Sequence, residues 1–273
     1  MNFKYTDYHI HCAPWSHDIG KIGPSFEDFI KVAEKNRINV CFLNHYELHP
    51  IEVDKNYPFY GDGKIEQYLE ELDRIKENYE FVLSGLEVDY YIDREMELWE
   101  FMDNYKKDIN FIAGTLHETV TGFPFTTREK LLKLLKKAKI KAIVDEYFDL
   151  MERMISSKIF KNICHLDTIF RYINTKDLSP TFDVDVSDER ILELGRLCIK
   201  NKQKIEYNLS GLRYPIARSF PSKQIIKKLK KEGAKIFVGS DSHTINYFRT
   251  RIYKVKKAYK YLKKIEKPKE NKI

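Results

Sequence analysis

The sequence predicts an α/β fold whose parallel strands close into a barrel of about seven strands. Short runs rich in β-branched and aromatic residues alternate with amphipathic helical stretches, which is the pattern of strand–helix–strand units with right-handed crossovers. Polar residues able to bind metal stand at the ends of six of these runs: His11, His45, Glu87, His117, His165 and Asp241. The carboxyl ends of barrel strands converge on one face, whereas an open sheet would spread them along a crevice, so these residues favour the barrel.

The expected elements follow one another through the whole chain. Strands are expected over residues 4–11, 38–45, 79–89, 109–117, 160–167, 203–210 and 234–243. Helices are expected over residues 25–37, 64–78, 93–107, 127–158, 188–201, 222–232 and 245–264, with the fourth broken. Residues 1–273 are therefore expected to form a single barrel domain, with a Lys-rich C-terminal helix and a frayed tail from about residue 266.

The composition is that of a globular protein with a large core. Hydrophobic residues make up 42% of the chain and aromatic residues 14%, which argues against disorder. The sequence contains neither an apolar run of about 18 residues nor an apolar segment near its start, so we expect no membrane span and no secretion signal. Cys12, Cys41, Cys164 and Cys198 lack a C-x-x-C spacing, which is typical of reduced thiols in a cytoplasmic protein.

The formal charge of +7 is concentrated in a few lysine-rich stretches. They read "LLKLLKKAKIK", "IIKKLKKEGAK" and, at the C-terminal end, "RIYKVKKAYKYLKKIEKPKENK". Such stretches usually form the solvated faces of helices, and this interpretation is favoured here. Nucleic-acid binding through the tail is the alternative, but we do not expect nucleic acid to be the partner.

The histidines form a pattern that predicts a metal centre. Side chains at i and i+2 of a strand share a face, so Asp7, His9 and His11 point the same way, and Asp241 and His243 repeat this pattern at the last strand. A lone histidine is more often an ordinary core or surface residue, but seven of the eight histidines lie at or just after a strand end. Ionisable groups gathered in a barrel mouth need a counter-charge, and divalent metal ions supply it.

The donor set also restricts the kind and number of ions. Histidine with a few carboxylates suits Zn, Mn or Fe better than Mg or Ca. Seven histidines with Glu87 and Asp241 are too many ligands for one ion, so two or three ions are expected, with a carboxylate bridging two of them. The surplus positive charge of such a site favours an anion such as phosphate.

Motifs along nearly the whole chain resemble those of the polymerase-and-histidinol-phosphatase (PHP) superfamily, in the same order. They are "DYHIH" at 7–11, the isolated His17, "NH" at 44–45, "GLEVD" at 85–89, "GTLH" at 114–117, "CHLD" at 164–167 and "GSDSH" at 239–243. The resemblance implies a distorted (β/α)7 barrel with a trinuclear metal centre. The segments "EVDYY" at 87–91, "DEYFDLM" at 145–151, "HLDTIFRY" at 165–172 and "NLSGLRYP" at 208–215 are most similar to the histidinol-phosphate phosphatases of this superfamily.

The resemblance also implies roles for individual residues. It places one ion on His9, His11, Glu87 and Asp241, a second on His17, His45 and His243, and a third on Glu87, His117 and His165, with Glu87 bridging. Arg171 and Arg213 match the arginines that hold the substrate phosphate, a task suited to the planar guanidinium fork, although a surface ion pair is the alternative for Arg213. The residues expected to have catalytic roles are therefore Glu87, Asp241, His243, Arg171 and Arg213.

Two departures from the family pattern concern the surroundings of these residues. Asn44 stands before His45 where relatives usually have an acid, so a contact there loses its charge. The sequence of the segment 118–127 after His117 also differs from that of relatives. This segment is expected near the mouth of the substrate site, so the difference concerns the identity of the leaving group more than the hydrolysis itself. Asp7, Asp89 and Asp167 are either outer partners of the metal ligands or simple polar caps at the barrel rim.

The resemblance implies a metal-dependent phosphomonoesterase with two or three Zn, Mn or Fe ions, acting on L-histidinol phosphate in histidine biosynthesis. One alternative is another PHP phosphoesterase acting on nucleotides or nucleic-acid ends, which would fit the Lys-rich tail. The other alternative is a non-catalytic metal-binding barrel, and the complete set of candidate ligands argues against it.

Overall fold

The structure is a computed structural model of the chain, and residues 2–48, 57–120, 124–172 and 188–265 are described. All seven predicted strands are present. They are β1 (Thr6–Ile10), β2 (Asn39–Tyr46), β3 (Val82–Asp89), β4 (Phe111–Thr115), β5 (Asn162–Ile163), β6 (Lys204–Asn208) and β7 (Lys235–Gly239). They belong to one sheet, whose order follows the order of the chain from β1 to β7.

The sheet has the topology of a (β/α)7 barrel. The pairs β1–β2, β2–β3 and β5–β6 are parallel. The segment after β7 returns to β1, because the Asp241 N–H donates to the His9 carbonyl (2.8 Å) and the His11 N–H donates to the Ser242 carbonyl (3.0 Å). A parallel bridge between Ile10 and Ser242 accompanies these bonds. First and last strands are therefore joined as a closed barrel requires, and the predicted fold class is confirmed.

The helices lie close to their predicted ranges. They are α1 (Phe26–Lys35), α2 (Lys64–Asn78), α3 (Glu95–Tyr105), α4 (Arg128–Leu135), α5 (Ile140–Ser157), α6 (Asp188–Lys200), α7 (Lys223–Lys231) and α8 (Ile245–Lys264). The stretch 127–158 is broken between α4 and α5, as expected. A short 3₁₀ helix, η1 (Ile92–Arg94), begins the helix expected from residue 93, whereas two others, η2 (Thr168–Tyr172) and η3 (Ser210–Arg213), were not predicted. Such short turns carry too little periodicity to be recognised in a sequence.

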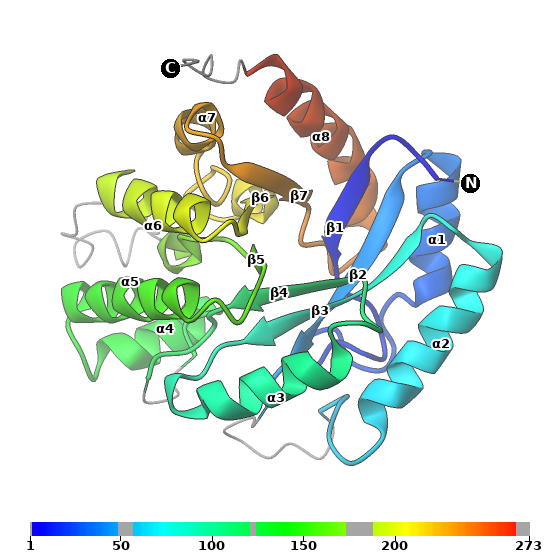
Figure 1. Ribbon diagram of the computed structural model, residues 1–273, viewed down its shortest axis with the longest axis horizontal. Coiled ribbons are helices and arrows are strands. Elements are labelled where there is room, and N and C mark those ends of the chain that lie inside the picture. Colours follow the sequence, from blue (N-terminus) through cyan, green and yellow to red (C-terminus); the bar gives the residue numbers. More distant parts are fainter. Residues whose placement is uncertain (1, 49–56, 121–123, 173–187, 266–273) are drawn as a thin grey trace. The chain divides into compact units, whose positions relative to one another are not determined.

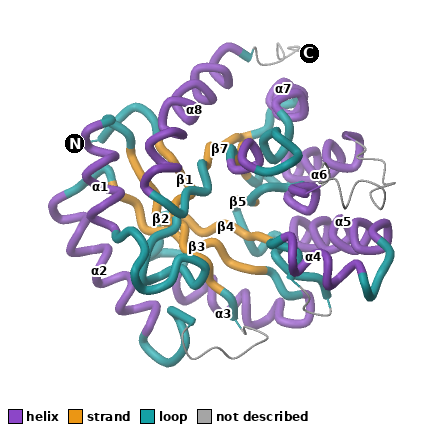
Figure 2. Tube along the Cα trace, turned by 180° about the vertical axis from the view of Figure 1, so that it is seen from behind, coloured by secondary structure: helices purple, strands orange, loops and turns teal. Residues whose placement is uncertain are grey.

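The chain divides into two compact units. The first comprises residues 1–89, 96–113 and 238–261, and within it α1 and α2 run beside β1, β2 and β3 (Figures 1 and 2). Its core contains the edge-to-face ring pairs Phe26–Phe42 and Phe29–Phe248, which join α1 to β2 and to α8. A capping box between Ser25 and Asp28 fixes the start of α1.

The second unit comprises residues 90–95, 114–237 and 262–273. Within it α5 and α6 lie side by side (Figures 1 and 2), and α5 buries nine residues along one face. The single domain expected over residues 1–273 stays a prediction, and the frayed tail expected from about residue 266 lies outside the described residues.

The lysine-rich helices are amphipathic. Helix α7 buries Ile225, Ile226 and Leu229, whereas its lysines are exposed or partly exposed. Helix α8 buries Phe248, Ile252 and Val255 in the same manner. The prediction of solvated helix faces is therefore confirmed for these two helices. The four cysteines are free and buried, and among the described residues no helix has the length and apolar character needed to cross a membrane.

Candidate metal centre

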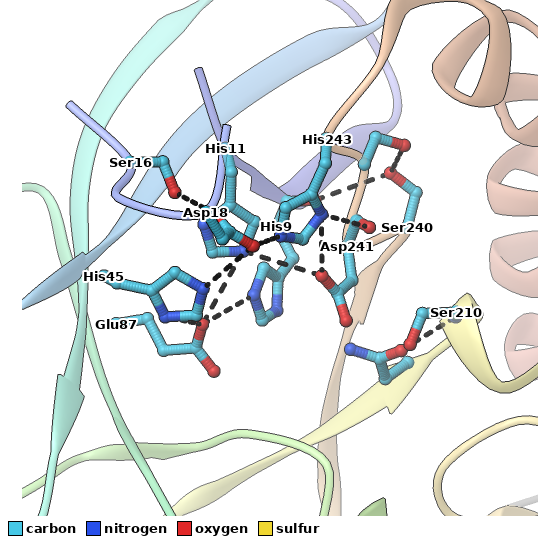
Figure 3. Close-up of polar contacts among 12 residues, drawn as sticks. His9, His11, Ser16, Asp18, His45, Glu87, Ser210, Ser240, Asp241 and His243 are labelled. Atoms are coloured by element: carbon cyan, nitrogen blue, oxygen red, sulfur yellow. Dashed lines mark hydrogen bonds and ion pairs between the residues drawn. The ribbon is translucent and has the colours of Figure 1, made fainter. Parts of the chain in front are cut away.

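Six of the predicted ligands gather at the strand ends of the first unit (Figure 3). They are His9 and His11 at the end of β1, His45 near the end of β2, Glu87 on β3, and Asp241 and His243 just after β7. Five of the six are buried, and His9, His11 and Glu87 are 0% exposed. Asp241 has a left-handed backbone, with φ of 55°, which only a few residue types such as Asp adopt without large strain. A non-glycine residue in this conformation often marks a functional position.

Glu87 lies at the centre of this cluster. Its Oε2 atom is 3.1 Å from His9 Nε2, 3.6 Å from His11 Nε2 and 3.3 Å from His45 Nδ1. One carboxylate oxygen therefore faces three imidazole nitrogens from three directions. Two ligand atoms that each lie about 2.1 Å from a tetrahedral ion are about 3.4 Å apart. The separations around Glu87 are close to this ligand-to-ligand distance.

Asp241 forms a second centre of contact. Its Oδ1 atom is 3.5 Å from His11 Nε2 and 3.4 Å from His243 Nδ1. Donor atoms of His9, His11 and Asp241 lie within 4.8 Å of one another, as do those of His11, His45 and His243. The first set, together with Glu87, is the group that the family resemblance implies for the first ion.

His11 provides the clearest test of whether metal ions fit here. Neither of its ring nitrogens has a hydrogen-bond partner within the described part of the chain, although the side chain is fully buried. Burial, followed by the neighbouring His243 and His45, holds the pKa of His11 well below its usual range. A neutral, buried imidazole without hydrogen bonds is costly unless it binds a cation. The residues present thus fit divalent metal ions.

His17 lies at the edge of the cluster rather than in it. Its side chain is 39% exposed, its ring centroid is 5.1 Å from that of His45, and its Nδ1 atom is 3.9 Å from Glu47 Oε1. The ring of His45 lies closer to that of His11 (4.3 Å) than to that of His17, and the ring of His243 is 4.2 Å from that of His11.

Asp18 is a neighbour of this group that sequence reasoning missed. Its Oδ2 atom is 2.7 Å from His243 Nε2 and 3.9 Å from His45 Nε2 (Figure 3). Burial acts to raise the pKa of Asp18, but the charge and hydrogen bond of His243 outweigh it and hold this pKa well below its usual range. The only signal in the sequence was that Asp18 directly follows His17.

The second unit contains the other two predicted histidines. The ring centroids of His117 and His165 are 5.4 Å apart, and the Nε2 atom of each lies 3.5 Å from Thr115 Oγ1. The backbone N–H of His165 donates to Glu206 Oε2 at 3.0 Å, and Glu206 is fully buried on β6. Sequence reasoning missed Glu206, although a carboxylate inside the strand run "KIEYN" was a signal. The third expected ion requires Glu87 of the first unit with these two histidines of the second, and it stays a prediction.

The two predicted phosphate-binding arginines lie on 3₁₀ turns of the second unit. Arg171 is on η2 and is 6% exposed, with Nη1 donating to the Thr126 carbonyl (2.9 Å) and Nε donating to Thr168 Oγ1 (3.2 Å). Arg213 is on η3 and is exposed. Both side chains reach Tyr214. The structure thus brings the two arginines together, with one fixed in the interior and the other open to solvent.

The three outer carboxylates have different surroundings. Asp7 accepts hydrogen bonds from the backbone N–H groups of His9 (3.3 Å) and Ser240 (2.8 Å), so it joins β1 to the end of β7. Burial raises the pKa of Asp7 to about 7. Asp167 forms an ion pair of 2.6 Å with Arg218, and burial raises the pKa of Asp167 despite this partner. Asp89 is buried at the end of β3.

Asn44 and the divergent segment are tied to the scaffold. The Oδ1 atom of Asn44 accepts from the Cys12 N–H at 2.9 Å, and its Nδ2 atom donates to Tyr68 Oη at 3.3 Å. Asn44 thereby holds the chain just after His11 through its carbonyl oxygen, and its amide nitrogen makes a contact to Tyr68 as a donor, which a carboxylate could not. In the segment 118–127, Glu118 and Pro124 form an antiparallel bridge, whereas residues 121–123 lie outside the described residues.

Comparison with known proteins gives a consistent set of relatives. No family model matches the chain. The histidinol-phosphatase of Bacillus subtilis is 25% identical over 226 residues, which cover 75% of this chain and 81% of that protein.

Two solved structures are also similar. A candidate histidinol phosphatase of Listeria monocytogenes aligns with a TM-score of 0.72 and 19% identity, over 89% of this chain and 96% of that one. The histidinol phosphate phosphatase of Lactococcus lactis, solved with zinc, L-histidinol and phosphate, aligns with a TM-score of 0.67 and 20% identity, over 93% and 94% of the two chains. These alignments show that the chain has the fold of both structures.

Proposed function

We propose that the chain belongs to the histidinol-phosphatase-like branch of the PHP superfamily and that it is a metal-dependent phosphomonoesterase, which hydrolyses L-histidinol phosphate to L-histidinol and phosphate. The observation that carries this proposal is the buried cluster around Glu87, in which one carboxylate oxygen faces the nitrogens of three histidines. For the stability of the fold alone, apolar residues of similar volume would serve at least as well as this buried polar cluster.

The proposed ligands fall into three groups. His9, His11, Glu87 and Asp241 hold the first ion, His17, His45 and His243 hold the second, and Glu87, His117 and His165 hold the third. Zn, Mn and Fe suit these donors. Such ions, when bound, activate water and neutralise the negative charge of phosphate oxygens.

The protein's own groups bind and orient the substrate phosphate. Arg171 is held by Thr126 and Thr168, so its position is fixed before substrate arrives. Arg213 is exposed and completes the phosphate site from η3. The two guanidinium groups donate hydrogen bonds to the phosphate oxygens. These bonds become stronger in the transition state, where the oxygens carry more negative charge.

Phosphate release by the metal-reconstituted protein tests this proposal. We expect the kcat/KM value for L-histidinol phosphate to exceed that for p-nitrophenyl phosphate by orders of magnitude, because specificity depends on differential binding of the transition state. Equal values for both compounds would indicate a general phosphatase instead. Degradation of single-stranded DNA under the same conditions would support the nucleic-acid alternative. The buried, free cysteines fit a reducing compartment, so we propose that the reaction takes place in the cytoplasm.

A further inference from the structure

Two buried polar side chains stand at the end of β6, the one strand whose end carries none of the predicted metal ligands. Asn208 is the last residue of the strand and is 0% exposed, and Ser210, which is 1% exposed, opens the η3 turn that follows. Within the described residues, the Nδ2 atom of Asn208 and the Oγ atom of Ser210 have no hydrogen-bond partner. Burying an amide or a hydroxyl group without a partner costs free energy, so two such groups side by side in the sequence indicate a partner from outside the chain.

The bonds made by the other atoms of these residues determine what the two unpaired groups can do. The backbone N–H and carbonyl of Asn208 both pair with Phe220, at 2.9 Å each. The Ser210 N–H donates to Asn208 Oδ1 at 2.8 Å (the dashed line beside Ser210 in Figure 3), which fixes the orientation of the amide and leaves Nδ2 as its unpaired end. An amide nitrogen only donates, and a hydroxyl group donates readily. The two groups therefore fit a ligand that offers acceptors.

The same turn carries one of the two arginines proposed to bind phosphate. Residues three apart in a 3₁₀ helix lie above one another, so Ser210 and Arg213 share one side of η3. The other arginine, Arg171, is tied to the segment that follows this turn, because its carbonyl accepts from the Ile216 N–H at 3.4 Å. The two unpaired donors thus belong to the same part of the second unit as the two guanidinium groups.

The chemistry of the proposed substrate decides which of its groups these donors bind. The amino group of histidinol is protonated at neutral pH and only donates, so it does not fit Asn208 Nδ2. A phosphate monoester has several oxygens, and at neutral pH most of them only accept. Neutral donors beside a guanidinium group are the set that binds such oxygens in proteins.

We propose that Asn208 and Ser210 are substrate-binding residues, which donate from Nδ2 and from the hydroxyl group to the phosphate oxygens beside Arg213. This inference rests on the proposed phosphomonoesterase function and adds two neutral donors to its phosphate site. Neither residue adds charge, so their contribution is to fix the orientation of the phosphate group.

Ser210→Ala separates a contact with the ligand from a structural role. It removes only the unpaired hydroxyl group and keeps the backbone N–H that donates to Asn208, so it should unfold in urea at the wild-type midpoint or above it. Its Kd for inorganic phosphate, measured by calorimetry on the metal-loaded protein, should rise about 10-fold or more, because hydrogen bonds to charged oxygens are among the stronger ones. Ser157→Ala is the matched control. The Ser157 hydroxyl donates to the Met154 carbonyl at 2.7 Å, so this variant should lose stability and bind phosphate normally.

Asn208→Asp tests the amide group. The carboxylate keeps an acceptor for the Ser210 N–H but places a negative oxygen where Nδ2 donates. Phosphate binding should therefore fall further than in Ser210→Ala, while the metal content by elemental analysis stays that of the wild-type protein. In both variants kcat/KM should fall by a similar factor for L-histidinol phosphate and for p-nitrophenyl phosphate, since these esters share only the phosphate group.

An unchanged Kd for phosphate in Ser210→Ala and Asn208→Asp would overturn the proposal. A lower unfolding midpoint of Ser210→Ala with an unchanged Kd would show that its hydroxyl group is structural. A loss of kcat/KM confined to L-histidinol phosphate would also overturn the proposal, because it would place the two donors at the leaving group. A wild-type protein that binds phosphate but hydrolyses neither ester would contradict the proposed function and leave this inference standing, whereas one that binds no phosphate would overturn both.

Discussion

The guanidinium groups of Arg171 and Arg213 meet on the same side chain, that of Tyr214. The Tyr214 hydroxyl oxygen lies 3.5 Å from Arg171 Nη1 and 3.1 Å from Arg213 Nη2, and the two guanidinium carbons lie 4.9 and 5.1 Å from the centre of the ring. The aromatic face attracts both cations and so offsets their mutual repulsion. Tyr214 thus holds two positive groups in one place, one buried and one exposed.

Arg213→Ala should lose activity while keeping its fold and its metal. Arg213 is exposed, so its replacement opens no cavity in the core. Loss of a charged hydrogen bond that strengthens in the transition state should cost about 2–4 kcal/mol, a factor of about 30 to 1,000 in kcat/KM. Arg213→Lys should restore little, because an ammonium group cannot make a two-pronged contact. Steady-state kinetics with elemental analysis checks this, and a metal-replete Arg213→Ala protein with wild-type kcat/KM would contradict the phosphate role.

Arg171→Ala should lose stability as well as activity. Its guanidinium group is buried and donates to the Thr126 carbonyl and to Thr168 Oγ1. The substitution removes both bonds; the Thr126 carbonyl still accepts from the Tyr172 hydroxyl (3.2 Å), whereas the buried Thr168 Oγ1 loses the guanidinium group. Each unsatisfied buried group costs about 1–3 kcal/mol, so we expect a clearly lower free energy of unfolding in urea. Arg213→Ala is the control in the same experiment and should unfold near the wild-type midpoint. Equal midpoints for all three proteins would show that Arg171 has no structural role.

Glu87→Gln should lower the metal content more than the loss of any single histidine. The Oε2 atom of Glu87 faces His9, His11 and His45 at once, and Glu87 is the residue proposed to bridge two ions. The amide is a weaker ligand and removes a negative charge from a buried site. Elemental analysis after reconstitution should show at least one ion fewer than in the wild-type protein. His17→Gln, at the exposed edge of the cluster, is the comparison, and a greater loss in that variant would argue against the central role of Glu87.

Chelation should destabilise the protein. The imidazoles of His9 and His11 and the carboxylate of Glu87 are completely buried, so in the absence of ions they remain desolvated without full compensation. An ion that binds only the folded state, at a free concentration of about 1,000 times its Kd, adds about 4 kcal/mol of stability. The melting temperature should therefore fall when a chelator is added and recover with Zn or Mn. The melting temperature of Glu87→Gln should respond less, and an unchanged wild-type melting temperature would count against a metal centre in the folded protein.

Most of the fold could be predicted from the sequence because its signals are local. The run "INVCFLNH" predicts a strand by its apolar residues, and β2 (Asn39–Tyr46) agrees with it to within one residue at each end. The predicted ligands were found in the same way, since His45 and Glu87 lie at or near the ends of such runs. Glu206 lies within another of these runs, but its burial could not be read from its position.

The contacts made by loops could not be predicted in this way. Asp18 faces His243 because a turn at Ser16 directs it there, and no periodicity encodes that direction. The η2 and η3 turns were missed although each carries a predicted arginine. Gly211 illustrates the same point, because a Cβ atom there would lie 2.0 Å from the Arg218 carbonyl oxygen. The requirement for glycine therefore comes from a neighbouring segment of the backbone.

The ion pair between Asp167 and Arg218 is a further contact between loops, and it should matter for stability. Asp167 is fully buried, and Arg218 Nη1 lies 2.6 Å from its Oδ2 atom. Breaking a buried pair by removing one partner costs about 3–5 kcal/mol, because the remaining charge is left without compensation. Arg218 is partly exposed, so Arg218→Leu should cost somewhat less, about 2–4 kcal/mol in urea unfolding.

The double variant Asp167→Asn/Arg218→Leu separates this explanation from a loss of packing. Neutralising Asp167 removes the uncompensated charge, so the double variant should be more stable than Arg218→Leu alone. If packing of the Arg218 side chain were the cause, the second substitution would add to the damage. A double variant that unfolds at a lower urea concentration than Arg218→Leu would therefore show that the ion pair does not stabilise this part of the second unit through its charge.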